Sequence, residues 1–153
     1  MEYDLIHDLR LDLLLHLCLG VVLGGAIGLE RELQHKAAGL RTNILICVGA
    51  VLFTELSIGI SSASGDPGRI AAQIVTGVGF LGAGTIIQAR GVVTGLTTAA
   101  TMWLVAAIGM AIGFGELLEA TGATLLVLLV LSLLRPIERV IAARSRYRSG
   151  GVE

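Results

Sequence analysis

Charged and polar residues that could form a binding site lie at Glu30-Arg31-Glu32 and at positions 41–43. Both groups border long apolar runs, so each charge is costly close to lipid unless it is paired. The most natural ion pairs join Glu30 to Arg31 or to Arg41. The residues at 41–43 are also expected to cap the following helix, by placing side-chain oxygens on its free N–H groups. Two interpretations stay open here, a structural ion-pair clasp and a functional site.

A second polar segment echoes the first at an offset of 56 residues. Gly39-Leu40-Arg41-Thr42 corresponds to Gly95-Leu96-Thr97-Thr98. A parallel repeat of this kind occurs in some transporters, although chance could also produce it. A true repeat would bring both segments to one end of the molecule. The polar cluster predicted there comprises Glu30, Arg31, Arg41, Thr42, Asn43, Gln88, Thr97 and Thr98.

Three further polar residues are candidates within the membrane or at its opposite face: Glu55, Arg69 and Gln73. A carboxylate inside an apolar run is a functional candidate by default, since burying it uncompensated is costly. We favour the alternative that Glu55 reaches the outer interface and there pairs with Arg69 or caps water. Asp12 and His16 lie one helical turn apart, but two such groups are weak evidence for a metal site.

The sequence contains no catalytic constellation. It lacks a nucleophile elbow, a zinc-protease helix motif and a phosphate loop with lysine. We therefore expect neither enzyme activity nor a cofactor, and whether a metal such as Mg²⁺ binds is left open. Both cysteines lie in apolar runs, which favours thiols that act as small apolar residues within the bilayer over a disulfide or a metal pair.

Composition indicates what positions these residues. Of 153 residues 54% are hydrophobic and only 15% are charged, more apolar surface than a small soluble domain could hide. Backbone groups in lipid must be satisfied internally, so the apolar runs must be helices. We predict an all-α, polytopic membrane protein with five transmembrane helices. The runs, each of 17 to 20 residues, are 13–29, 42–60, 70–89, 96–114 and 117–134.

The basic residues predict the orientation of these spans. Nine lie in the connections and tail assigned to one side, and two lie on the other. The positive-inside rule then gives an extracytoplasmic N-terminal segment 1–12, a transmembrane domain 13–134 and a basic cytoplasmic tail 135–153. The acidic amino terminus does not resemble a cleaved signal peptide. The net charge of −1 offers no reason to expect a nucleic-acid partner.

Glycines are spaced so that helix backbones can approach closely. Small residues repeated every four positions are typical of helix crossings in membranes. A match to the dinucleotide-binding glycine pattern at 77–82 is rejected, because no strand precedes it. The glycines expected at helix crossings are Gly20, Gly24, Gly28, Gly77, Gly79, Gly82, Gly84, Gly109 and Gly113.

Four collinear motifs, 30–43, 68–75, 79–84 and 95–103, resemble the MgtC/SapB family of bacterial inner-membrane proteins. The resemblance implies a role in growth under magnesium limitation and, in some pathogens, in survival inside macrophages. It also implies, from the best-known member, inhibition of the proton-translocating ATP synthase rather than transport. Longer relatives carry a soluble domain after the fifth span, so the sequence resembles a short form. Position 97 is threonine where some relatives have asparagine.

Three functions compete. The first is a regulator in the bacterial inner membrane that binds another membrane complex, or a second copy of itself, through glycine-lined helix faces. The second is a carrier or channel for Mg²⁺ or another ion, and the third is a membrane scaffold. A Mg²⁺ path needs oxygen ligands near mid-membrane, and run 70–89 offers only Thr76 near its middle. This weighs against transport unless an oligomer assembles a pore.

Overall fold

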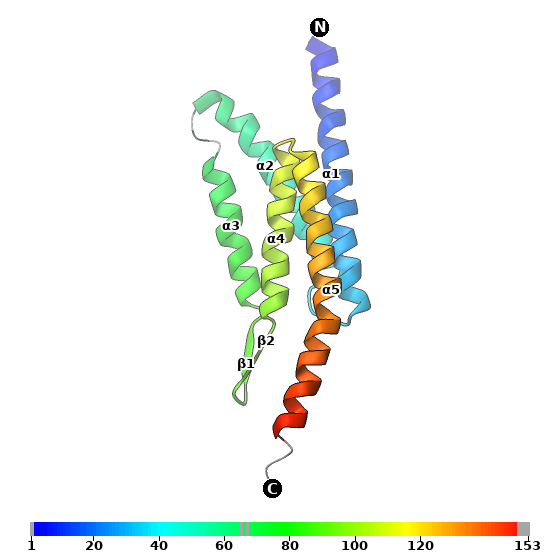
Figure 1. The fold of residues 1–153 in the computed structure, drawn as a ribbon. Coiled ribbons are helices and arrows are strands. Elements are labelled where there is room, and N and C mark those ends of the chain that lie inside the picture. The colour runs from blue at the N-terminus through cyan, green and yellow to red at the C-terminus, as the bar shows by residue number, and fades with distance from the viewer. Residues whose placement is uncertain (1, 65, 67, 150–153) are drawn as a thin grey trace.

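The computed structural model describes residues 2–64, 66 and 68–149, and side chains within 11–60, 66 and 68–135. Five helices and one short hairpin make up this part of the chain (Figure 1). In chain order they are α1 (Glu2–Leu33), α2 (Leu40–Ser64), α3 (Gly68–Ala83), β1 (Ile87–Ala89), β2 (Val92–Thr94), α4 (Leu96–Gly113) and α5 (Leu117–Ser149).

The predicted all-α membrane bundle is confirmed. Four described helices are long and apolar enough to cross a membrane, over Leu11–Leu33, Leu40–Ile60, Leu96–Gly113 and Leu117–Arg135. Many large apolar side chains on them are exposed, as expected where lipid rather than water is the surrounding solvent. The tight turn expected between the last two spans is also present, and Gly115 adopts a positive φ of 83° there.

The prediction of one continuous span over 70–89 is wrong. Helix α3 ends at Ala83, and its 16 residues fall just short of the usual spanning length. The chain then forms an antiparallel hairpin in which Ala89 pairs with Val92. Arg90 and Gly91 have φ values of 50° and 78°, the paired positive values that a two-residue hairpin turn needs.

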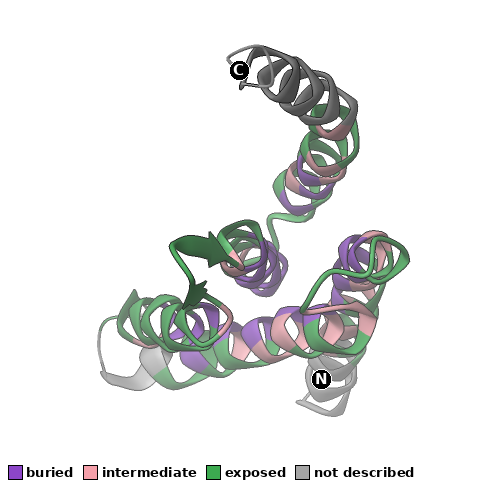
Figure 2. Cartoon of the chain, turned by 90° about the horizontal axis from the view of Figure 1, so that it is seen from below, coloured by how far each residue is buried: buried purple, intermediate pink, exposed green. Residues whose placement is uncertain are grey.

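Helix α2 is the centre of the bundle. It runs obliquely behind α4 in Figure 1, from the side of α1 to the side of α3. One buried cluster joins α2 to α1, α4 and α5 around Ile27, Val51 and Ile112. A second joins it to α3 and α4 around Ile74 and Met102. Figure 2 shows the buried residues facing inward between the helices.

Glycines bring α1 and α4 close to neighbouring faces of α2, and both crossings include Cys47. A Cβ on Gly24 would lie 2.7 Å from the Cβ of Cys47, and one on Gly28 would lie 2.8 Å from the Cα of Leu40. On the α4 side, a Cβ on Gly113 would lie 2.7 Å from the Cβ of Thr54. Gly20 and Gly109 lie at the same two crossings. These separations are too short for any side chain, so glycine is required at both crossings.

The glycines of the 77–84 segment do not form the close helix crossings that we predicted for them. Gly77 and Gly79 have no neighbouring atom within 4 Å of an added Cβ among the described residues. Gly82 is buried but makes ordinary contact with Ala99 of α4. Gly84 meets only the backbone of its own helix end. Helix α3 is therefore not held by close glycine crossings within this chain.

The end of the bundle near the α2–α3 connection holds one ion pair between described residues. Nδ1 of His16 lies 2.5 Å from Oε1 of Glu55, so the predicted pairing of Glu55 with Arg69 is wrong. Arg69 and Gln73 are both exposed on α3. Asp66 caps α3 as expected, since its carboxylate accepts a hydrogen bond from the N–H of Gly68 at 2.8 Å.

Candidate functional site

The predicted polar cluster lies where α1 ends, α2 and α4 begin and α5 passes by (Figure 1). Helix α1 continues through Glu30-Arg31-Glu32 to Leu33, so these three residues belong to a helix and not to a connection. The α1–α2 connection is therefore shorter than predicted. Helical geometry spreads Glu30, Arg31 and Glu32 around different sides of α1.

Arg31 points into the bundle. Only 3% of its surface is exposed, and its guanidinium donates a hydrogen bond to Oγ1 of Thr98 at 3.1 Å. The Nε–H of Arg31 has no partner among the described residues. The hydrogen bond between Arg31 and Thr98 joins two residues of the predicted polar cluster, from the end of α1 to the first turn of α4.

Glu30 pairs with a residue that the sequence did not suggest. Its Oε1 accepts a hydrogen bond from the guanidinium of Arg135 on α5 at 2.5 Å, and both side chains are largely buried. The predicted ion pairs of Glu30 with Arg31 or Arg41 are therefore not the ones formed. Glu30 still attracts Arg31 electrostatically, while Arg135 repels it.

Asn43 acts as a hydrogen-bond donor at the start of α2, whereas we predicted an acceptor there. Its side-chain amide donates hydrogen bonds to the carbonyls of Ala38 and Gly39. We expected a side-chain oxygen from positions 41–43 to accept from free N–H groups. The oxygen that does so belongs to Glu32, which accepts from the N–H of Leu40 at 3.0 Å. Asn43 therefore orders the connection that leads into α2.

Of the other residues predicted for the polar cluster, three lie outside it and one lies beside it. Arg41 and Thr42 are exposed on the first turn of α2, and Gln88 is exposed on β1. Among the described residues, no hydrogen bond or ion pair joins any of these three side chains to Arg31 or Glu30, so none of them belongs to the cluster. Thr97 is exposed on α4 but lies beside Thr98 at the edge of a cavity.

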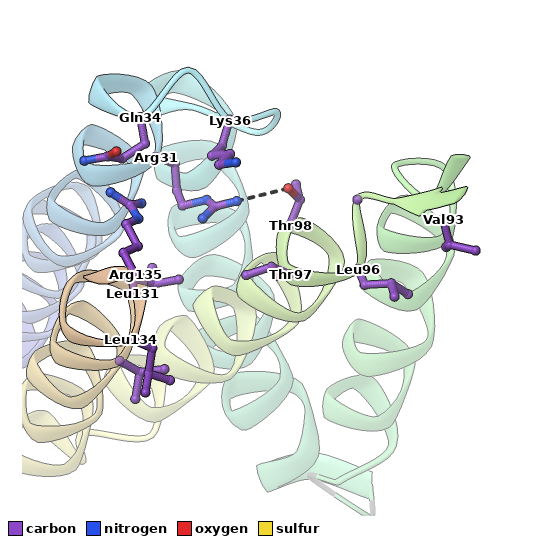
Figure 3. Close-up of a pocket in the computed structure, with 12 residues that line it drawn as sticks. Arg31, Gln34, Lys36, Val93, Leu96, Thr97, Thr98, Leu131, Leu134 and Arg135 are labelled. Carbon is purple, nitrogen blue, oxygen red and sulfur yellow. Dashed lines mark hydrogen bonds between the residues drawn. The ribbon is translucent and has the colours of Figure 1, made fainter. Parts of the chain in front are cut away.

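This cavity has a volume of about 690 Å³ and lies between α1, α4 and α5. Figure 3 shows Arg31, Lys36 and Arg135 converging on it from α1, the α1–α2 connection and α5. Its other side is apolar and comes largely from α5. The lining residues are Arg31, Gln34, Lys36, Val93, Gly95, Leu96, Thr97, Thr98, Val130, Leu131, Leu134 and Arg135.

Sequence reasoning missed the contribution of α5 and of the α1–α2 connection to this site. Arg135 was assigned to the tail, although it is the first basic residue after an apolar run. That position alone places it at the same membrane boundary as Arg31. Lys36 and Gln34 lie on the same connection as the charged motif and could have been included on that ground.

Comparison with known proteins agrees with this architecture. Residues 17–140 match the MgtC family. The chain is 48% identical over 129 residues to Protein MgtC of Brucella abortus, covering 83% of this chain and 53% of that protein. It is 49% identical over 114 residues to Protein MgtC of Salmonella typhimurium, covering 74% of this chain and 48% of that protein.

The chain thus spans about half the length of the curated relatives it matches. No solved structure matches it. The match includes both the charged motif at the end of α1 and Arg135 on α5, so the polar cluster lies wholly within the shared region. The chain belongs to the MgtC family.

Proposed function

We propose that this protein is a membrane-embedded regulator, linked to growth under magnesium limitation, that acts by binding another membrane complex. The link to magnesium rests on membership of the MgtC family and on the resemblance described above. The resemblance also suggests the proton-translocating ATP synthase as the complex. The mode of binding rests on the open face of α3.

An apolar groove between α2 and α3 supports this proposal. Its volume is about 720 Å³, and apolar residues such as Leu45, Phe53 and Leu81 line most of it. Gly49 of α2 and Gly77 of α3 both line it. Neither glycine has a neighbouring atom within 4 Å of an added Cβ. The groove therefore offers smooth backbone surface with room beside it.

Such a surface suits a transmembrane helix of another protein. Helices in lipid associate by close packing over small residues rather than by burial from water. Gly77 and Gly79 are free for this purpose, whereas the glycines of α1 and α4 are already used inside the bundle. Phe80 beside them is 81% exposed and supplies a large side chain that a partner could enclose.

Filling the groove should abolish function without damaging the fold. We expect Gly77→Leu to lose support of growth in low Mg²⁺ while its amount in the membrane stays at the wild-type level. The matched control is Gly122→Leu on α5, where an added side chain also meets open space but no groove is present. Normal growth of the Gly77→Leu strain at normal abundance would contradict the proposal.

Photocrosslinking from the same face tests the nature of the partner. A photoreactive residue at Phe80 should capture an ATP synthase subunit, whereas one at Leu118, which is 82% exposed on α5, should not. Gly77→Leu should reduce the crosslink from position 80 about tenfold, the effect of a 1.4 kcal/mol loss in binding. Crosslinks to a second copy alone, or Mg²⁺ flux by purified protein in liposomes, would favour the competing functions.

The orientation in the inner membrane is also a proposal. Among described side chains, Arg31, Lys36, Arg41, Arg90 and Arg135 lie at the end of the bundle that we assign to the cytoplasm, and Arg69 lies at the other. This asymmetry supports an external amino terminus and a cytoplasmic carboxyl terminus.

Labelling of intact cells with an impermeant thiol reagent should show this orientation. Gln34→Cys in the α1–α2 connection should stay unlabelled, and Glu116→Cys in the α4–α5 turn should be labelled. Both positions are exposed, so they form a matched pair. Labelling of Gln34→Cys alone would invert the assignment.

A further inference from the structure

We propose that the cavity between α1, α4 and α5 is a binding site for a phosphate group, either of a membrane lipid or of a soluble phosphate compound. The proposal does not depend on the α2–α3 groove. It rests on the charges that face the cavity, on one buried unpartnered donor, and on the helix that begins at its wall.

The charge around the cavity is unbalanced. Three basic residues line it, Arg31, Lys36 and Arg135, and none of its described lining residues is acidic. Glu30 pairs with Arg135 and also attracts Arg31, and Glu32 accepts a hydrogen bond from the N–H of Leu40. Among the described residues no carboxylate forms an ion pair with Arg31 or Lys36, and the three basic groups outnumber the two acidic ones, which favours occupation by an anion.

Arg31 is held ready for such an anion. It is almost fully buried, and its hydrogen bond to Thr98 fixes the direction of its guanidinium. Its Nε–H has no partner among the described residues. A buried donor left unsatisfied is costly, and a planar guanidinium matches the oxygens of a phosphate in two-point contact.

The start of α4 adds a second set of donors. Gly95 precedes α4 with a φ of 90° and provides no side-chain cap. The first N–H groups of a helix lack intrahelical partners and favour negative charge. Gly95, Thr97 and Thr98 all line the cavity, so this helix start and the two threonines face the same space as Arg31.

The apolar wall suggests why the ligand is a phosphate group and not a small ion alone. Val130, Leu131 and Leu134 of α5 form an apolar wall of the cavity. The cavity lies where the apolar stretch of α5 ends at Arg135, which is the level of lipid phosphates. It is also larger than a single phosphate needs. Both an anionic lipid headgroup and a soluble phosphate compound fit this chemistry.

Two arms of one experiment distinguish these sources. Purified full-length protein is titrated with inorganic phosphate at constant ionic strength, and binding is followed by the shift in thermal unfolding. In parallel, mixed micelles carry either phosphatidylglycerol or diacylglycerol of the same chain length, and retained lipid is counted by native mass spectrometry. Constant ionic strength is required because salt screens exposed charges.

The variants separate this site from general surface charge. We expect Arg31→Gln to weaken binding about tenfold, the loss of one charge-assisted hydrogen bond. Lys36→Gln should weaken it roughly threefold, since Lys36 is exposed. Arg90→Gln removes one positive charge from the hairpin outside the cavity and should leave binding unchanged. If Arg31→Gln fails to fold, Lys36→Gln against Arg90→Gln still decides.

Each outcome has one meaning. Retention of phosphatidylglycerol over diacylglycerol, reduced in Lys36→Gln, assigns the site to a lipid phosphate. Stabilisation by inorganic phosphate, reduced in the same variant, assigns it to a soluble phosphate compound. Equal binding by wild type, Lys36→Gln and Arg90→Gln in both arms would overturn the proposal.

Discussion

Replacing Gly109 by leucine is expected to prevent the protein from accumulating in the membrane. A Cβ at this position would overlap the carbonyl oxygen of Cys47 and lie 2.8 Å from the Cβ of Ala50. Both belong to α2, and Cys47 is also in close contact with Gly24 of α1. A shift of α2 away from α4 would therefore also disturb its close packing against α1.

The expected cost is large for a single substitution. Overpacking a tight interior typically costs about 1–3 kcal/mol and occasionally more, and here the nearest obstacle is a backbone carbonyl of α2. We expect a loss of about 3 kcal/mol or more in the free energy of unfolding, measured by unfolding in detergent. Gly122→Leu is the control, because its added side chain meets open space. Equal stability of the two variants would show that the α2–α4 crossing is looser than described.

The second large loss of stability is expected from the substitution Glu30→Gln. This change removes the carboxylate that pairs with Arg135 at 2.5 Å and also attracts Arg31. Two guanidinium groups would then repel each other at the membrane boundary with no acid between them. Removing one partner of a buried ion pair costs about 3–5 kcal/mol. Because part of each side chain is solvent-accessible, we expect about 2–3 kcal/mol here.

A second substitution identifies the cause of that loss. Replacing Arg135 by methionine in the Glu30→Gln background removes the unpaired charge and keeps an apolar stem of similar length. We expect the double variant to recover part of the lost stability in thermal unfolding, whereas Arg41→Met, an exposed change on α2, should recover none. Additive losses from Glu30→Gln and Arg135→Met would exclude a coupled pair.

The sequence was sufficient for features that depend on local pattern. Four of the five predicted helical spans, the tight turn at Gly115 and the cap at Asp66 follow from apolar length and turn residues, and these appear. The hairpin was missed because Ile86 and Ile87 are as apolar as the helix before them. Its signals were Arg90-Gly91 and the β-branched run 92–94, which favour a turn and a strand.

The candidate site could be predicted only in part, because its contacts join distant parts of the chain. The repeat brought Arg31 and Thr98 to the same end, and they form a hydrogen bond. The partner of Glu30 is 105 residues away, and nothing in local spacing distinguishes Arg135 from Arg41. His16 was considered only as a weak metal ligand, yet it is the residue that pairs with Glu55. Which of several nearby charges pair is decided by how the helices cross.

The length of α3 has a consequence for the surrounding lipid. Sixteen residues extend about 24 Å at 1.5 Å per residue, against a hydrocarbon thickness of about 30 Å. The hairpin that follows has open strand edges, which are not tolerated in hydrocarbon, so it cannot lengthen the span. A span of this length requires the bilayer beside α3 to thin, flanking side chains to reach the interface, or the helix to associate with another. This hydrophobic mismatch raises the free energy of the lipids that contact α3. A protein surface that replaced those lipids would remove this cost.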